Sequence, residues 1–156
     1  MSRTPSGPAT YPKPRTYVYI DGFNLYYGCL ENQPYKWLDL ETFCRRLLPK
    51  NDVQRIKYYT ARIAAPSSGT TTVQARKRQA KAQHQEVYLR ALGTLPLVSI
   101  TYGHYLSHAV SMPLASPSRG GPFNVQVIKN EEKGSDVNLA THLVLDACGM
   151  RTMSLY

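Results

Sequence analysis

The chain has 156 residues, of which 42% are hydrophobic and 19% charged, and its formal net charge is +9. This length suits one domain, and the hydrophobic content supplies a core, so wholesale disorder is excluded. No stretch approaches the roughly 18 apolar residues that would span a bilayer, and no apolar run before Tyr17 would act as a secretory signal. Three widely spaced cysteines give neither a disulfide framework nor a zinc motif. We therefore expect a cytoplasmic protein without membrane partners.

The positive charge is concentrated in residues 45–90, which hold eleven basic side chains and two acidic ones. The remainder of the chain is neutral. A one-sided basic segment of this kind favours a polyanionic partner, and nucleic acid is the first candidate. The alternative is a solvated helix face that keeps the protein soluble.

The first half of the chain begins with residues 1–16, which hold four prolines and are expected to form a disordered basic lead-in. Apolar spacing and turn residues then predict four elements in chain order: a strand at 17–20, a helical turn at 24–30, a helix at 38–48 and a strand at 53–63.

The second half is expected to open with a long basic helix at 72–92, which Gly93 stops as a C′ residue. The following segments are a strand at 97–102, an inserted loop or hairpin at about 103–128 with its returning strand at 123–129, a helix from Ser135 to about 147, and an irregular tail at 148–156. Alternating strands and helices predict one α/β domain over 17–147, with a parallel sheet covered by helices.

Two acidic residues stand out as candidates for chemistry. Asp21 directly follows the first strand, where ligands bind in open α/β sheets, and Asn24 is placed to orient it. Asp136 opens the last helix after Gly134. The functional interpretation is a Mg²⁺ or Mn²⁺ site shared by these two carboxylates. The alternatives are a turn-forming Asp-Gly pair for Asp21 and a helix cap for Asp136. Asp146 lies too far along a straight helix to share the ion.

The residues around these acids resemble known motifs. Residues 17–28, YVYIDGFNLYYG, are similar to the opening motif of NYN domains, which are PIN-like nucleases related to LabA-like proteins. Residues 132–140, EKGSDVNLA, resemble the second motif of that family. The resemblance implies a PIN-like (Rossmann-like) three-layer fold with a parallel central sheet, and a metal-dependent ribonuclease that hydrolyses RNA phosphodiester bonds.

Carried onto this chain, the resemblance gives Asp21 and Asp136 as metal ligands and catalytic residues, and Asn24 as their partner. The basic residues expected to grip the RNA backbone are Arg62, Arg76, Lys77, Arg78, Lys81 and Lys133. The family's C-terminal strand and its acidic motif have no match here, so the domain looks C-terminally truncated. We therefore expect RNA binding with little cleavage, the alternative being a catalytically inactive RNA-binding module. Loss of that strand would expose the edge at 17–20 and favour a homodimer.

Overall fold

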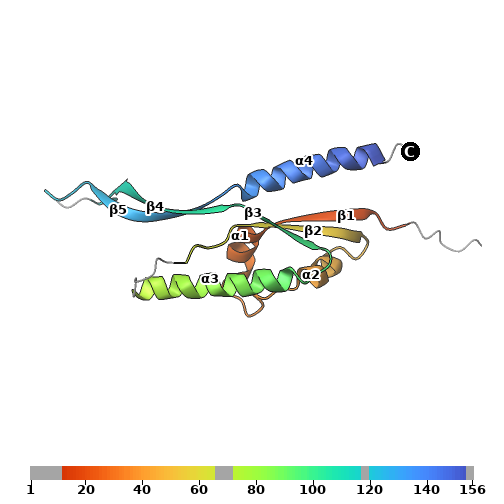
Figure 1. Ribbon diagram of the computed structural model, residues 1–156, viewed down its shortest axis with the longest axis horizontal. Coiled ribbons are helices and arrows are strands. Elements are labelled where there is room, and N and C mark those ends of the chain that lie inside the picture. The colour runs from red at the N-terminus through yellow and green to blue at the C-terminus, as the bar shows by residue number, and fades with distance from the viewer. Residues whose placement is uncertain (1–11, 66–71, 117–119, 154–156) are drawn as a thin grey trace, which may run out of the picture.

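The computed structural model describes residues 12–65, 72–116 and 120–153 (Figure 1). Strands and helices alternate along most of this chain, so the predicted α/β class is confirmed. The elements in order are β1 (Arg15–Asp21), α1 (Gly22–Leu25), the π-helix η1 (Tyr26–Leu30), α2 (Leu40–Leu47), β2 (Asp52–Thr60), α3 (Val73–Leu92), β3 (Val98–Tyr102), β4 (His104–Pro113), β5 (Asn124–Lys133) and α4 (Ser135–Met153).

The central sheet has three parallel strands in the order β1-β2-β3. Residue Ile20 of β1 pairs with Tyr58 of β2, and Tyr58 pairs with Ile100 of β3. Strand β1 therefore lies at one edge of the described sheet, as predicted. Self-association through that edge stays a prediction.

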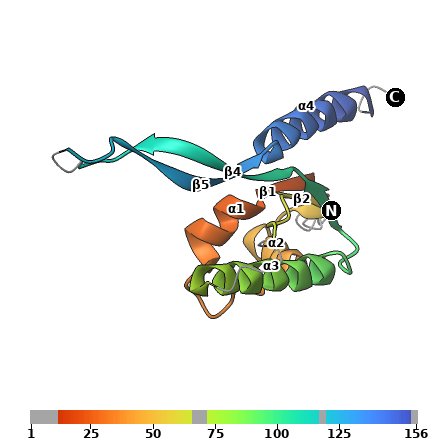
Figure 2. The ribbon, with the colours of Figure 1, turned by 60° about the vertical axis from the view of Figure 1, so that its left-hand side comes forward.

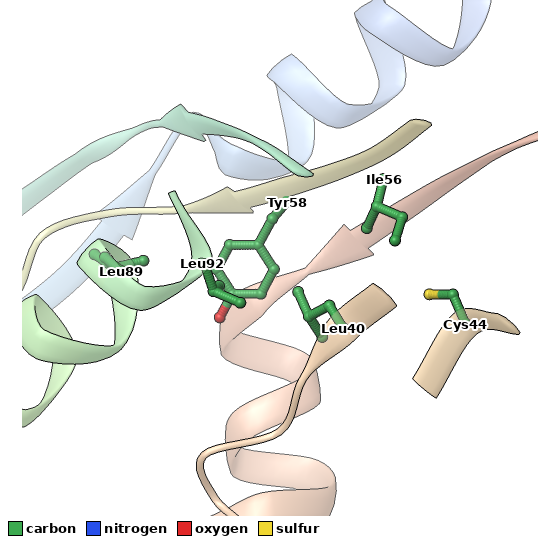
Figure 3. Close-up of a cluster of buried hydrophobic side chains, with 6 residues drawn as sticks. All are labelled: Leu40, Cys44, Ile56, Tyr58, Leu89 and Leu92. Atoms are coloured by element: carbon green, nitrogen blue, oxygen red, sulfur yellow. The ribbon is translucent and has the colours of Figure 1, made fainter. Parts of the chain in front are cut away.

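One face of the sheet packs on α2 and α3. Tyr58 and Ile56 of β2 meet Leu40 of α2 and Leu92 of α3, and these side chains are 5% exposed or less (Figure 3). Asp39 begins α2 by accepting hydrogen bonds from the backbone N–H groups of its first turn, as its position in the sequence predicts. Burial of apolar area between these elements is the main force that holds them together.

The opposite face of the sheet is covered by α4, which gives three layers (Figures 1 and 2). Here the contacts are polar. Lys57 Nζ lies 2.5 Å from Asp146 Oδ2, and the hydroxyl of Tyr19 donates to the same oxygen. The hydroxyl of Tyr59 lies 3.0 Å from His142 Nδ1. The three-layer arrangement agrees with the sequence, whereas the narrower PIN-like topology stays a prediction.

Strands β4 and β5 form a separate antiparallel hairpin that projects away from the central sheet (Figure 2). Of the two alternatives expected for about 103–128, a loop or a hairpin, the hairpin is present, and its pairing starts at His104 opposite Lys133, earlier than the loop-like composition of 107–122 suggests. Serine and proline content misled the interpretation: alternate side chains such as Val110 and Val127 still face one another across the ladder.

Several element boundaries in the structure also differ from those predicted. Strand β1 begins at Arg15, inside the predicted lead-in, of which residues 1–11 lie outside the described residues. Helix α4 continues to Met153, so the irregular tail predicted from 148 is helical up to that point. Gly93 does end α3, but in a right-handed conformation with φ −65°. Within the described ranges, no helix has the length and apolarity to cross a membrane.

Candidate functional site

Asp21 is the last residue of β1 and caps the helix that follows. Its Oδ1 accepts from the backbone N–H of Asn24 at 2.9 Å, and its Oδ2 accepts from Asn24 Nδ2 at 3.0 Å. The predicted partnership of these two residues is therefore present. Asp21 is also the N-cap of α1, a role that the sequence analysis, which left open only a turn-forming Asp-Gly pair here, did not name.

Asp136 lies in the first turn of α4, where the partial positive charge of a helix N-terminus favours a carboxylate. The turn before it depends on Gly134, whose φ of +93° strains any other residue. Glu132 Oε1 accepts from the backbone N–H of Ser135 at 2.9 Å and completes this end of the helix. A Cβ on Gly103 would lie 2.6 Å from the carbonyl oxygen of Lys133, so the start of the hairpin is clamped against the same turn.

The structure brings Asp21 and Asp136 together. A hydrogen bond with Asp21 raises the pKa of Asp136, and so do the negative charge of Asp21, burial and, more weakly, Glu132. A hydrogen bond between two carboxyl groups requires a proton on one of them. The raised pKa of Asp136 therefore follows mainly from the proximity of Asp21.

The metal expectation stays a prediction. Within the residues that the structure describes, no group of three or more His, Cys, Asp or Glu side chains could hold a metal ion. Asp21 and Asp136 supply two carboxylates, and Asp146 is engaged instead by Tyr19 and Lys57. Mg²⁺ accepts one or two carboxylates with several waters, so the pair alone fits a hydrated ion and no larger cage.

The basic residues expected to form one groove differ in their surroundings: some form ion pairs within the fold, one donates to a serine, and others are exposed. Arg62 pairs with Glu86 at 3.1 Å, and Lys81 pairs with Glu31 at 2.9 Å. The others are also varied: Lys133 pairs with Glu131 at 3.4 Å, Arg78 donates to Ser107 Oγ at 3.4 Å, and Arg76 and Lys77 are exposed on α3. Several of these charges are thus neutralised within the fold.

The structure also contains an aromatic pocket that the sequence reasoning missed. It lies between α1, η1, the segment before α2, β2 and α3, and has a volume of about 740 Å³, which includes space open to solvent. Its lining residues are Gly22, Phe23, Tyr26, Tyr27, Leu30, Lys36, Trp37, Tyr58, Thr60, Ile63, Lys81, His84, Gln85 and Tyr88. The available signal was the density of aromatic residues in 23–37. Phe23, Tyr26 and Tyr27 stand at helical spacing, but no local pattern shows that Trp37 and residues of β2 and α3 converge on them.

Ring contacts fix the walls of the aromatic pocket. Trp37 meets His84 and Tyr88 edge-on, each with centroids 6.1 Å apart. Phe23 and Tyr27 are stacked at 6.0 Å. The hydroxyl of Tyr88 donates to the carbonyl of Leu38 at 2.9 Å, which ties α3 to the segment before α2. Such edge and stacked arrangements leave ring faces and edges available to a flat ligand.

Tyr58 and Tyr88, two phenols of this pocket, stay protonated at neutral pH. Burial is the main cause that raises the pKa of Tyr88 to about 12, and burial likewise raises the pKa of Tyr58. The charge of Asp21 contributes to the shift at Tyr58, and Gly22, the next residue, lines the pocket. Gln85 is held in place by Ala61, whose carbonyl accepts from its side chain at 2.9 Å.

Comparison with known proteins gives one informative similarity. The chain is 33% identical over 157 aligned residues to "6-hydroxy-3-succinoylpyridine 3-monooxygenase HspA" from Pseudomonas putida (strain DSM 28022 / S16). The alignment covers 85% of this chain and 47% of that protein, so the chain spans about half the length of the curated relative it matches. No family model and no solved structure matches the chain.

These findings overturn the function predicted from the two motifs. The relative is named as a monooxygenase, which is an oxidoreductase, and no family model, that of the NYN domain included, matches the chain. The assignment to the NYN ribonucleases is therefore wrong, and the alternative of an inactive RNA-binding module gains no support. The physical reason lies in the residues: Asp21, Asn24 and Gly134 form caps and turns that carry no specific reaction.

Proposed function

We propose that this chain contributes the substrate-binding part of an oxidoreductase that acts on a small hydroxylated pyridine. The aromatic pocket carries this proposal. Flat rings bind well between tyrosine and tryptophan side chains, and a few polar groups fix their orientation. The relative's name specifies a pyridine with a hydroxyl group and a succinoyl chain, and that chemistry fits a pocket lined by rings with two lysines.

The chemistry sets a limit on what the pocket contributes. Monooxygenation inserts one atom of O₂ into the substrate and reduces the other to water. This takes two electrons and two protons; a reductant such as a reduced nicotinamide supplies the electrons and one proton as a hydride, and the second proton comes from solvent. Tyrosine, tryptophan and lysine side chains do not supply those electrons repeatedly. The sequence contains no Gly-x-Gly-x-x-Gly turn for a dinucleotide, so we derive no electron-transfer step in this chain. We assign the pocket the binding and orientation of the ring.

Neutral phenols support that role. Tyr58 and Tyr88 stay protonated, so they carry no negative charge that would repel an anionic ligand. His84 and Thr60 add polar groups at the same pocket. This combination of a mostly apolar wall and a small number of polar groups is typical of small-molecule sites.

The test uses the single tryptophan of the chain, Trp37, which lies in the pocket. Titration with 6-hydroxy-3-succinoylpyridine is expected to change Trp37 fluorescence saturably, whereas succinate alone leaves it unchanged. Tyr27→Ala should weaken binding, and Tyr35→Ala serves as a matched control because Tyr35 is similarly exposed, at 57% against 51%, but does not line the pocket. No saturable change with the pyridine would overturn the proposal.

A further inference from the structure

We infer that Lys81 selects ligands that carry a carboxylate. In the absence of such a ligand, the Lys81 ammonium group is paired with the carboxylate of Glu31. This inference rests on the proposed function and deepens it. Lys81 lines the pocket, whereas Glu31 does not. Lys81 Nζ donates to Glu31 Oε1 at 2.9 Å and lies 5.6 Å from the centroid of the Tyr27 ring. Lys81 therefore contacts both a pocket wall and a carboxylate outside the pocket.

The element that carries Glu31 also carries the pocket wall. Tyr26, Tyr27 and Leu30 belong to the π-helix η1, and Glu31 follows directly, its backbone N–H bonded to the Tyr26 carbonyl at 2.8 Å. π-helical turns are rare and occur frequently at functional sites. The same short turn thus sets the position of the rings and of the carboxylate that faces Lys81.

The Lys81–Glu31 pair is suited to exchange. The two side chains are 50% and 32% exposed, and ion pairs this open to water contribute little to stability. The hydrogen bond to Glu31 is the main reason that the pKa of Lys81 is raised, so the ammonium group stays charged. A ligand carboxylate that enters over Tyr27 would meet a charged donor whose present partner is easily released. The succinoyl chain named for the relative ends in such a group.

The test compares an acid with its neutral analogue, 6-hydroxynicotinate and 6-hydroxynicotinamide, in Trp37 fluorescence titrations. The acid should bind at least about tenfold more tightly, the scale of one charge-assisted hydrogen bond. Lys81→Met should remove that preference, so that the acid and the amide bind with equal affinity. Glu31→Gln should strengthen acid binding several-fold without affecting the amide, because the competing carboxylate is gone.

Two variants serve as controls. Lys77→Met removes an exposed lysine of α3 that lies outside the pocket. Glu86→Gln, also on α3, breaks the ion pair between Glu86 and Arg62. Neither should change the preference for the acid. Equal affinity for acid and amide in the parent chain, or an unchanged preference in Lys81→Met, would overturn this inference while the pocket itself stands. If neither ligand changes Trp37 fluorescence, the proposed function fails first, so the two failures are distinguishable.

Discussion

Gly22 packs against the ring of Tyr58 so closely that a Cβ atom at position 22 would lie 2.5 Å from both the Cζ and the hydroxyl oxygen of Tyr58. Tyr58 is a core residue of β2 and also a wall of the aromatic pocket. Gly22 immediately follows Asp21. The close approach of this glycine therefore links the core, the pocket and the carboxylate pair.

Gly22→Ala is expected to lower the free energy of unfolding by about 1–3 kcal/mol, because the methyl group forces a buried ring to move. It should also weaken ligand binding, since the displaced ring belongs to the pocket. Urea unfolding and the Trp37 titration measure the two effects. Gly28→Ala is the matched control: a Cβ there meets nothing within 4 Å, so its stability should be unchanged or slightly higher. Equal behaviour of the two variants would contradict the packing described.

Asp146→Asn is expected to destabilise the protein by about 1–3 kcal/mol, because it leaves Lys57 without its carboxylate partner. The hydrogen bonds from Lys57 and then Tyr19 lower the pKa of Asp146. Because the pKa is lowered, the carboxylate stabilises the fold at pH values above the ordinary pKa of an aspartate. This contribution is lost as the pH falls through the lowered pKa. Unfolding of parent and variant should therefore converge in acid. Asp52→Asn, which removes only a bond to Gln54, should show no such pattern.

Asp39→Ala should cost about 1 kcal/mol, the usual value of an N-cap. Hydrogen bonds from Thr42, through both its side chain and its backbone, lower the pKa of Asp39, so this cost should shrink as the pH falls through the carboxyl range. Thr72→Ala removes the N-cap of α3, whose hydroxyl oxygen accepts from Ala75 N–H at 3.2 Å. Its cost should not depend on pH. A pH-independent cost for Asp39→Ala, measured by urea unfolding, would count against the assigned hydrogen bonds.

Asp136→Asn tests the carboxylate pair and the predicted cation. Because the pKa of Asp136 is raised, the parent fold should lose stability as the pH rises from the ordinary carboxyl range through the raised value. The variant should not show this loss. If the pair binds Mn²⁺, millimolar Mn²⁺ should raise the melting temperature of the parent at neutral pH and not that of the variant. The same shift in both proteins would show that Mn²⁺ does not bind at this pair.

Local signals were sufficient for much of the fold. Asp39 sits directly before periodic apolar residues and Thr72 before a long, strongly basic segment, and each does begin a helix. Asp21 ends a short β-branched and aromatic strand, as predicted. Each of these features depends on a few neighbouring residues, so the local sequence is enough to predict it. The meeting of Asp21 with Asp136 was also predictable, since a strand end and a helix start share one edge of the sheet.

The remaining features depend on contacts between distant segments. The pocket joins Trp37, Tyr58 and Tyr88, which come from three separate elements, and no local period reveals that they converge. Strand β4 forms because β5 supplies its hydrogen bonds, in spite of a composition typical of loops. The ribonuclease function predicted from the two motifs was wrong for a related reason. The motif residues report a local backbone geometry, and proteins with different reactions can share such geometry.

The separate hairpin has a consequence for the order of folding. Its strands are close in sequence and pair with each other, so they close a small loop, and hairpins of this kind form within microseconds. Asp136 lies just beyond β5, yet it reaches Asp21 only after the parallel strands have been assembled across their helical crossovers. We expect pulsed hydrogen exchange to protect Val110 and Val127 before Ile20 and Tyr58. The carboxylate pair and the ring-lined pocket would then be completed last, at the slowest step of assembly.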